Sequence, residues 1–187
     1  PSIAAYLAMR DINTESQWKT IAPHLSLTEI NQEHAGRVDE FMERAAAEFE
    51  IIIIDLGSIS GLSNRLTDRR WTSTMTTWCC DQADELMIVS RADQLGTHRL
   101  AQVIELLGNT SVRASLSFVM NMKSPGKRGE KEEAQFLNYA TTLKPIRIRS
   151  IVKDSRAVTA AEDEHATLVE INERSNVRKS IAELARE

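Results

Sequence analysis

Residues 49–56 read FEIIIIDL, and this short segment decides the expected fold class. Four consecutive isoleucines cannot alternate between a core and solvent, so a strand built from them must be covered on both faces. That requirement is typical of a central strand in a parallel sheet with helices on either side. We therefore predict a buried central strand over 49–56, with Asp55 near its carboxyl end.

Helices and strands alternate along the rest of the chain. A helix of about twenty residues is expected before the isoleucine run, because Ser26 and Glu29 have capping-box spacing. Further strands are predicted at ELMIVS (85–90), ASLSFVMNM (114–122) and IRIRSIV (146–152), with helical patterns between them. Residues 123–131 (KSPGKRGEK) are expected to form a loop before a helix over 132–143, and Ser175 or Asn176 caps the last helix.

This order predicts one α/β domain over residues 1–187. Strands separated by helices of ten residues or more form βαβ units, whose right-handed crossovers build a doubly wound, mostly parallel sheet flanked by helices. Ligands of such sheets bind outside the carboxyl ends of the strands, so the residues that follow each strand are the candidates for a site.

Composition excludes several classes of protein. Lys and Arg number 23 against 27 Asp and Glu, a net charge of −4, which does not favour coating of nucleic acid or of an anionic membrane. The two cysteines, Cys79 and Cys80, are adjacent, and the histidines show no metal-ligand spacing. No apolar run approaches the roughly 20 residues that span a bilayer. We expect a cytoplasmic protein.

Two strand-end side chains suggest a nucleotide site. Asp55 is placed as the carboxylate that holds the water shell of Mg²⁺ beside phosphates, and the amide of Gly57 could approach a terminal phosphate. The alternative is that Asp55 caps the following turn. Asn121 carries the donors and the acceptor that read the edge of adenine, or else it holds the loop that begins there. Asp154 precedes a helical pattern and is a candidate N-cap.

The order of these signals resembles the ParA/MinD-type ATPases, most closely the CpaE/TadZ-like and actinobacterial chromosome-partitioning relatives. The resemblance covers nearly the whole chain. FEIIIIDLG (49–57) looks like the Walker B strand and its aspartate, and FVMNM (118–122) looks like the strand whose Asn contacts adenine. Residues 81–100, 151–170 and 175–185 are similar to the segments that follow in the family. The chain departs from the family at Lys153, where Pro is usual, and at Glu164 and His165, which replace a Gly.

The resemblance implies a P-loop NTPase-like fold and a nucleotide-dependent switch for partitioning or positioning a cellular cargo. ATP and Mg²⁺ are the implied cofactors. Asp55 orders the Mg²⁺ shell through water, Gly57 belongs to switch II, and Asn121, Met122 and Asp154 lie beside the adenine. A homodimer and a further partner protein are implied, and charge does not favour DNA or a membrane as that partner.

The family's deviant Walker A loop, with its two lysines, belongs before residue 1. We expect ATP hydrolysis only if such a loop lies upstream, and neither catalysis nor tight ATP binding by residues 1–187 alone. The alternative function is a non-catalytic pseudo-ATPase scaffold that docks a pilus, secretion or division apparatus.

Overall fold

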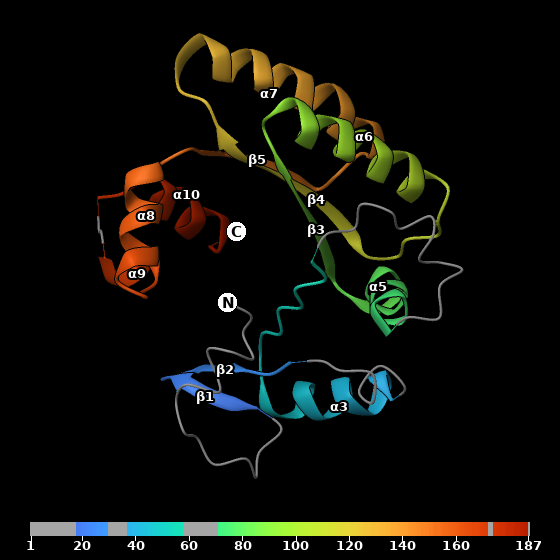
Figure 1. Cartoon of the computed structure of the whole chain (residues 1–187). Helices are drawn as coiled ribbons and strands as arrows, with labels where there is room; N and C mark the ends of the chain where they lie inside the picture. The colour runs from blue at the N-terminus through green and yellow to red at the C-terminus, as the bar shows by residue number, and fades with distance from the viewer. Residues whose placement is uncertain (1–17, 30–36, 58–70, 172–173, 187) are drawn as a thin grey trace.

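A three-stranded parallel sheet forms the centre of the computed structural model, which describes residues 18–29, 37–57, 71–171 and 174–186 (Figure 1). Its strands are β3 (Glu85–Arg91), β4 (Ser115–Lys123) and β5 (Arg147–Val152), in the spatial order β3-β4-β5. Successive strands are joined by helices, as parallel pairing requires. The structure is thus a mixed α/β fold with a parallel sheet flanked by helices, and it agrees with the coarse prediction.

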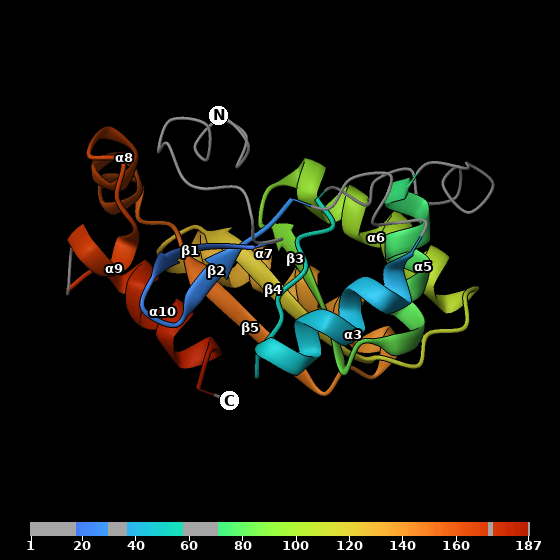
Figure 2. The ribbon, with the colours of Figure 1, turned by 90° about the horizontal axis from the view of Figure 1, so that it is seen from below.

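Helices cover both faces of this sheet (Figures 1 and 2). On one face lie α6 (Gln94–Gly108) and α7 (Gly126–Ala140), which bury Phe118, Met120 and Phe136 in the main core. On the other face, residues of α8 (Ser155–Asp163), α9 (Leu168–Ile171) and α10 (Asn176–Leu184) pack with Val119 and Ile151. Phe118 and Val119 belong to different cores, so β4, the middle strand of the sheet, is covered on both faces.

The N-terminal part of the described chain packs around its own small apolar core, and α5, which belongs to that core, leads into β3. It contains the hairpin strands β1 (Lys19–Ala22) and β2 (Leu25–Leu27), the helix α3 (Val38–Glu48) and α5 (Trp71–Gln82). Met75 of α5 packs against the apolar face of α3, and Trp78 Nε1 donates a hydrogen bond to Asp39 Oδ1 at 2.8 Å. The remaining element is a 3₁₀ turn, η1 (Thr141–Leu143).

The predicted central strand over 49–56 is wrong, because residues 49–57 form no strand in the structure. Ile54 and Leu56 pack against the α3–α5 cluster, whereas Ile51 and Ile53 are 78% and 89% exposed. Only one face of the segment is therefore covered. Among the described residues, β3 pairs with β4 alone and does not accept the isoleucine run as a neighbour.

Two other boundaries differ from the prediction. Ser26 lies in β2, so the expected helix does not begin there, and α3 begins only at Val38. The expected loop over 123–131 is mostly helical, because α7 begins at Gly126. By contrast, the strand predictions at 85–90, 114–122 and 146–152 are confirmed, as is Ser175 as the cap of α10. None of the helices in the described ranges has the length and apolar character needed to cross a membrane.

Candidate functional site

The carboxyl ends of the three parallel strands lie at one edge of the sheet and are joined by backbone hydrogen bonds. Ala92 N, just beyond β3, donates to Asn121 O at 2.9 Å, and Lys153 N, just beyond β5, donates to Lys123 O at 2.9 Å. Asn121 and Asp154 therefore leave neighbouring strands at the same edge, as the parallel topology predicts. We call this region the strand-end edge, comprising residues 91–93, 121–126 and 153–154.

An irregularity in β4 places Asn121 and Met122 at the middle of the strand-end edge. The register with β5 shifts between Met120 and Lys123. Met122 has a φ of 62°, and its backbone N–H donates to Asn121 Oδ1 at 2.8 Å. A left-handed backbone is uncommon for a residue other than glycine, and bulges of this kind often redirect side chains beside functional sites. Sequence reasoning named both residues but did not anticipate the bulge.

Asp154 joins two helix N-termini. Its Oδ1 accepts from Ala157 N at 3.2 Å and caps α8, and its Oδ2 accepts from Ser175 Oγ at 3.0 Å. Ser175 in turn caps α10 through Arg178 N. The capping role expected for Asp154 is confirmed, and the second bond to Ser175 could not be anticipated because it links residues 21 positions apart.

Asp55 and Gly57 form a local turn on an exposed segment. Gly57 N donates to Asp55 Oδ1 at 2.8 Å, and Gly57 has a φ of 65°, a conformation that glycine adopts without steric cost. This hydrogen bond is the one expected if Asp55 caps the turn that follows it, which was the alternative to a role beside Mg²⁺. Because residues 51–57 are not a strand of the sheet, the sheet does not carry Asp55 to the strand-end edge as the strand prediction required.

A cluster of paired side chains that the sequence did not reveal holds the start of α7 against β4 and β5. Lys123 Nζ and Ser150 Oγ both donate to the Glu133 carboxylate at 2.5 Å. Ser124 donates to Glu132 through its backbone N–H and its hydroxyl, each at 2.9 Å. The hydrogen bond from Lys123 lowers the pKa of Glu133, and the backbone bond from Ser124 lowers that of Glu132.

The start of α6 is packed directly against the end of β3. Asp93 caps the helix by accepting from Gly96 N at 2.8 Å, and Ser90 Oγ donates to Gly96 O at 3.0 Å. A Cβ at position 96 would lie 2.2 Å from Arg91 O, so only glycine fits this close approach. Helices α6, α7 and α8 thus all begin at the strand-end edge, and the N–H groups of the first turn of a helix point out of its N-terminus.

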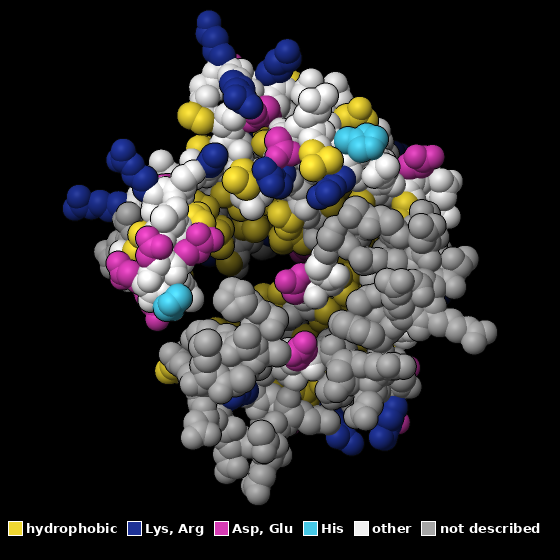
Figure 3. Space-filling model, in the orientation of Figure 1, with side chains coloured by type: hydrophobic (Ala, Val, Ile, Leu, Met, Phe, Trp, Pro, Cys, Tyr) yellow, Lys and Arg dark blue, Asp and Glu magenta, His cyan; other side chains and the backbone are white. Residues whose placement is uncertain are grey.

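Positive charge accompanies these helix starts. Lys127, Lys153 and Arg156 are exposed there, and Arg91 is 63% exposed while it pairs with Asp93 at 2.5 Å. Figure 3 shows Lys and Arg side chains standing out along the upper and left parts of this face, where α7 and α8 lie in Figure 1. Helix N-termini and cations together suit an anionic ligand. The net charge of −4 for the whole chain gave no sign of this local group of positive side chains.

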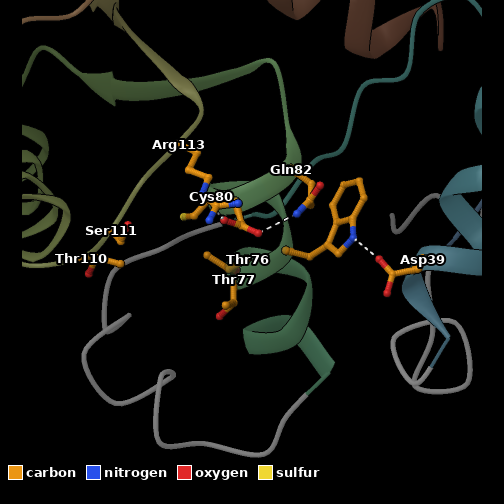
Figure 4. A pocket seen from close by; sticks show the side chains of 10 residues that line it. Asp39, Thr76, Thr77, Cys80, Gln82, Thr110, Ser111 and Arg113 are labelled. Atoms are coloured by element: carbon orange, nitrogen blue, oxygen red, sulfur yellow. Dashed lines mark hydrogen bonds and ion pairs between the residues drawn. The ribbon is translucent and has the colours of Figure 1, made fainter.

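A cavity of ≈ 410 Å³ lies elsewhere, between α3, α5 and the segment that enters β4 (Figure 4). Two pairs of its polar groups are bonded to each other, since Trp78 donates to Asp39 and Arg113 Nε lies 3.1 Å from Asp81 Oδ1. Cys80 also lines it, and burial raises the pKa of this thiol. None of the residues predicted for the nucleotide site lines this cavity.

Among the described residues, no group of three or more His, Cys, Asp or Glu side chains is placed to hold a metal ion. The strand-end edge offers an amide side chain, exposed cations and helix N-termini, which can donate hydrogen bonds to an organic anion. In comparisons with known proteins, no family model matches the chain and no curated protein matches it.

Proposed function

We propose that the chain is a nucleotide-dependent switch protein of the ParA/MinD type that acts in the cytoplasm in partitioning or positioning a cellular cargo. The observation that supports this most directly is the bulge at Asn121 and Met122 in the middle of the strand-end edge. A left-handed methionine costs free energy, and such outliers concentrate at ligand sites. The edge also lies where nucleotides bind in open parallel sheets.

In this proposal Asn121 recognises the adenine of ATP. Its Oδ1 and Nδ2 can read the base edge in two hydrogen bonds once Met122 N releases the oxygen. Met122 and Asp154 border the same edge and flank the base. Exposed Lys127 lies in the first turn of α7, and together with the N-terminus of that helix it favours negative charge.

Asp55 and Gly57 supply the switch. Asp55 would hold the water shell of Mg²⁺ when Mg-ATP is bound, and the Gly57 amide, which now bonds Asp55 Oδ1, would be the donor to a phosphate. If a phosphate-binding loop lies upstream, Mg²⁺ held there would supply charge neutralisation for phosphoryl transfer to water. Loss of the 2.8 Å bond between Gly57 and Asp55 would then couple nucleotide binding to the segment over 51–57. A homodimer with a further partner protein would carry this change to the cargo.

The base-recognition step can be tested with nucleosides, which need no phosphate-binding loop. We expect adenosine at millimolar concentration to shift the NMR signals of the Asn121, Met122 and Asp154 amides, and guanosine to leave them unchanged. Asn121→Ala should weaken adenosine binding roughly tenfold, because a lost hydrogen bond with an unsatisfied partner costs about 1–3 kcal/mol.

Asn138→Ala is the matched control, because Asn138 is exposed on α7 and its loss removes the same amide away from the edge. Equal shifts with adenosine and guanosine, or equal weakening by the two Asn variants, would contradict the assignment to Asn121.

A second function, a pseudo-ATPase scaffold that docks a pilus, secretion or division apparatus, is favoured by a different observation. The Asp55, Asn121 and Asp154 side chains all accept local hydrogen bonds from the backbone. If capping is their whole role, Asp55→Ala and Asn121→Ala lower thermal stability and leave nucleotide affinity unchanged. Thermal melts run beside nucleotide titrations on both variants distinguish the scaffold from the switch.

A further inference from the structure

Helix α10 is tied to the strand-end edge by a hydrogen bond between two side chains. Asp154 Oδ2 accepts from Ser175 Oγ at 3.0 Å, and the same hydroxyl oxygen accepts from Arg178 N in the first turn of α10 at 3.4 Å. Ser175 is 3% exposed, so the link is shielded from water. A buried polar group is costly to leave without its hydrogen bond. The position of Asp154 and the docking of α10 therefore depend on each other.

Asp154 is also connected to the residues that we propose to read the base. Lys153 N donates to Lys123 O at 2.9 Å, directly after the bulge at Asn121 and Met122. Met122 N in turn donates to Asn121 Oδ1 at 2.8 Å. A continuous series of hydrogen bonds and short backbone segments thus runs from the Asn121 side chain to the start of α10.

Helix α10 is a short element that is held in place by few side chains. Of its nine residues only Val177 is buried, in the core that Val119 and Ile151 of the sheet contribute to. Leu184 is partly buried against that core, and Ile181 is 43% exposed. A helix of this length is marginal in water without tertiary packing. Opening of α10 is therefore a local unfolding step, and the helix has a docked and an open state.

The far end of α10 is held by a different residue. Arg147 Nη1 donates to Leu184 O at 3.2 Å, and Arg147 is the first residue of β5, at the end of the strand away from the strand-end edge. The two ends of α10 are thus held by separate contacts. Only the contact at its start, through Ser175, reaches Asp154.

We propose that α10 regulates the strand-end edge, docking more tightly when adenine occupies it. The inference rests on the proposed function, in which Asp154 flanks the base. While α10 is docked, the Asp154 carboxylate is oriented by Ala157 N and by Ser175 Oγ before the base arrives. When α10 opens, the second donor is lost, and ordering Asp154 again opposes binding. The base therefore favours the docked state, and by reciprocity docking favours the base.

Hydrogen exchange of the α10 amides, followed by NMR on the full chain, tests this coupling. Saturating adenosine should slow exchange in α10 roughly tenfold, within the range of about 5–150-fold that is typical of coupled sites. Exchange detects opening even when the open state is rare. Without adenosine, the α10 amides should exchange faster than those of β4, because α10 opens without the sheet.

Variants separate the Ser175 link from the general stability of α10. Ser175→Ala removes the hydroxyl, so adenosine should slow exchange in α10 by less than about twofold, down from the coupled effect. Leu184→Ala is the matched control, because it loosens α10 by removing apolar packing and leaves Asp154 and Ser175 in place. In this control the roughly tenfold effect of adenosine should persist. Ser175→Thr keeps the hydroxyl and should behave like the wild type.

Two results would overturn this inference and leave base recognition intact. One is an adenosine shift at the Asn121 amide without slower exchange in α10, and the other is an equal adenosine effect in Ser175→Ala and Leu184→Ala. Exchange in α10 as slow as in β4 without adenosine would also overturn it, because α10 would then have no open state of its own. No adenosine shift at Asn121 would overturn the proposed function and this inference together.

Discussion

At the scale of single residues, the strand-end edge combines local caps with one conformational outlier. Asp154 and Ser175 occupy ordinary capping positions that any compatible sequence would use. Met122 differs, because a side chain at φ 62° is disfavoured by contact between its Cβ and its own backbone. The backbone conformation of Met122 therefore lowers the stability of the folded state and does not add to it.

Met122→Gly measures the cost of that conformation. Glycine removes the Cβ, so the free energy of unfolding should rise by about 1 kcal/mol relative to Met122→Ala, which keeps the Cβ and loses the same side chain beyond it. Urea denaturation of the two variants provides the comparison. Equal stability of the Gly and Ala variants would show that the backbone at 122 carries no strain.

At the scale of elements, the isoleucine run shows how strongly strand formation depends on a partner. Ile54 and Leu56 pack on one side of the run, as alternate residues of a strand would, yet the run pairs with no strand among the described residues. Ile51 and Ile53 consequently face away from any covering layer. The β3 strand, which is no more apolar, is a strand because β4 lies beside it.

This difference predicts unequal costs for two isoleucine substitutions. Ile88→Ala in β3 should lower the free energy of unfolding by about 2–5 kcal/mol, because Ile88 is 5% exposed in the main core. Ile53→Ala should change it by less than about 0.5 kcal/mol, because Ile53 is 89% exposed. Thermal or urea unfolding measures both. A loss at Ile53 as large as that at Ile88 would mean that the run is buried in solution.

At the scale of the whole molecule, the contacts that join α7 to both β4 and β5 make stability depend on pH. The Glu133 carboxylate is held by Lys123 and Ser150, and these bonds lower its pKa below the ordinary value of 4.5. A carboxyl group with a lowered pKa in the folded state stabilises the fold fully above its unfolded pKa. That contribution is lost as the pH falls below 4.5 through the folded value.

Glu133→Gln should therefore destabilise the protein at pH 7 and much less at pH 3. The amide keeps the shape and one acceptor but removes the charge that Lys123 pairs with. Urea midpoints of wild type and variant across this range measure the difference, with Glu130→Gln on the exposed side of α7 as the control. A difference that stays constant from pH 7 to pH 3 would contradict the assigned role of the ion pair.

The start of α7 illustrates what the sequence left undetermined. Residues 123–131 look like a basic loop, because Gly126, Gly129 and Pro125 weaken any helical pattern. In the structure, Glu132 and Glu133 hold Ser124 and Lys123, and the close packing of Gly129 on Ser124 O allows the helix to begin at Gly126. These bonds depend on where β5 places Ser150, which no local pattern reveals.

The sequence by itself determined the three strands β3, β4 and β5, the helices between them, and the caps at Asp154 and Ser175, because those features depend on apolar runs and on neighbours three residues away. From the parallel topology it also placed Asn121 and Asp154 at one edge. Only the tertiary structure decided that residues 49–56 form no strand, that Met122 lies in a bulge, and that cations gather at the strand ends. Each of these depends on which segments meet in space, and strand pairing, register and charge proximity are properties of pairs distant in sequence.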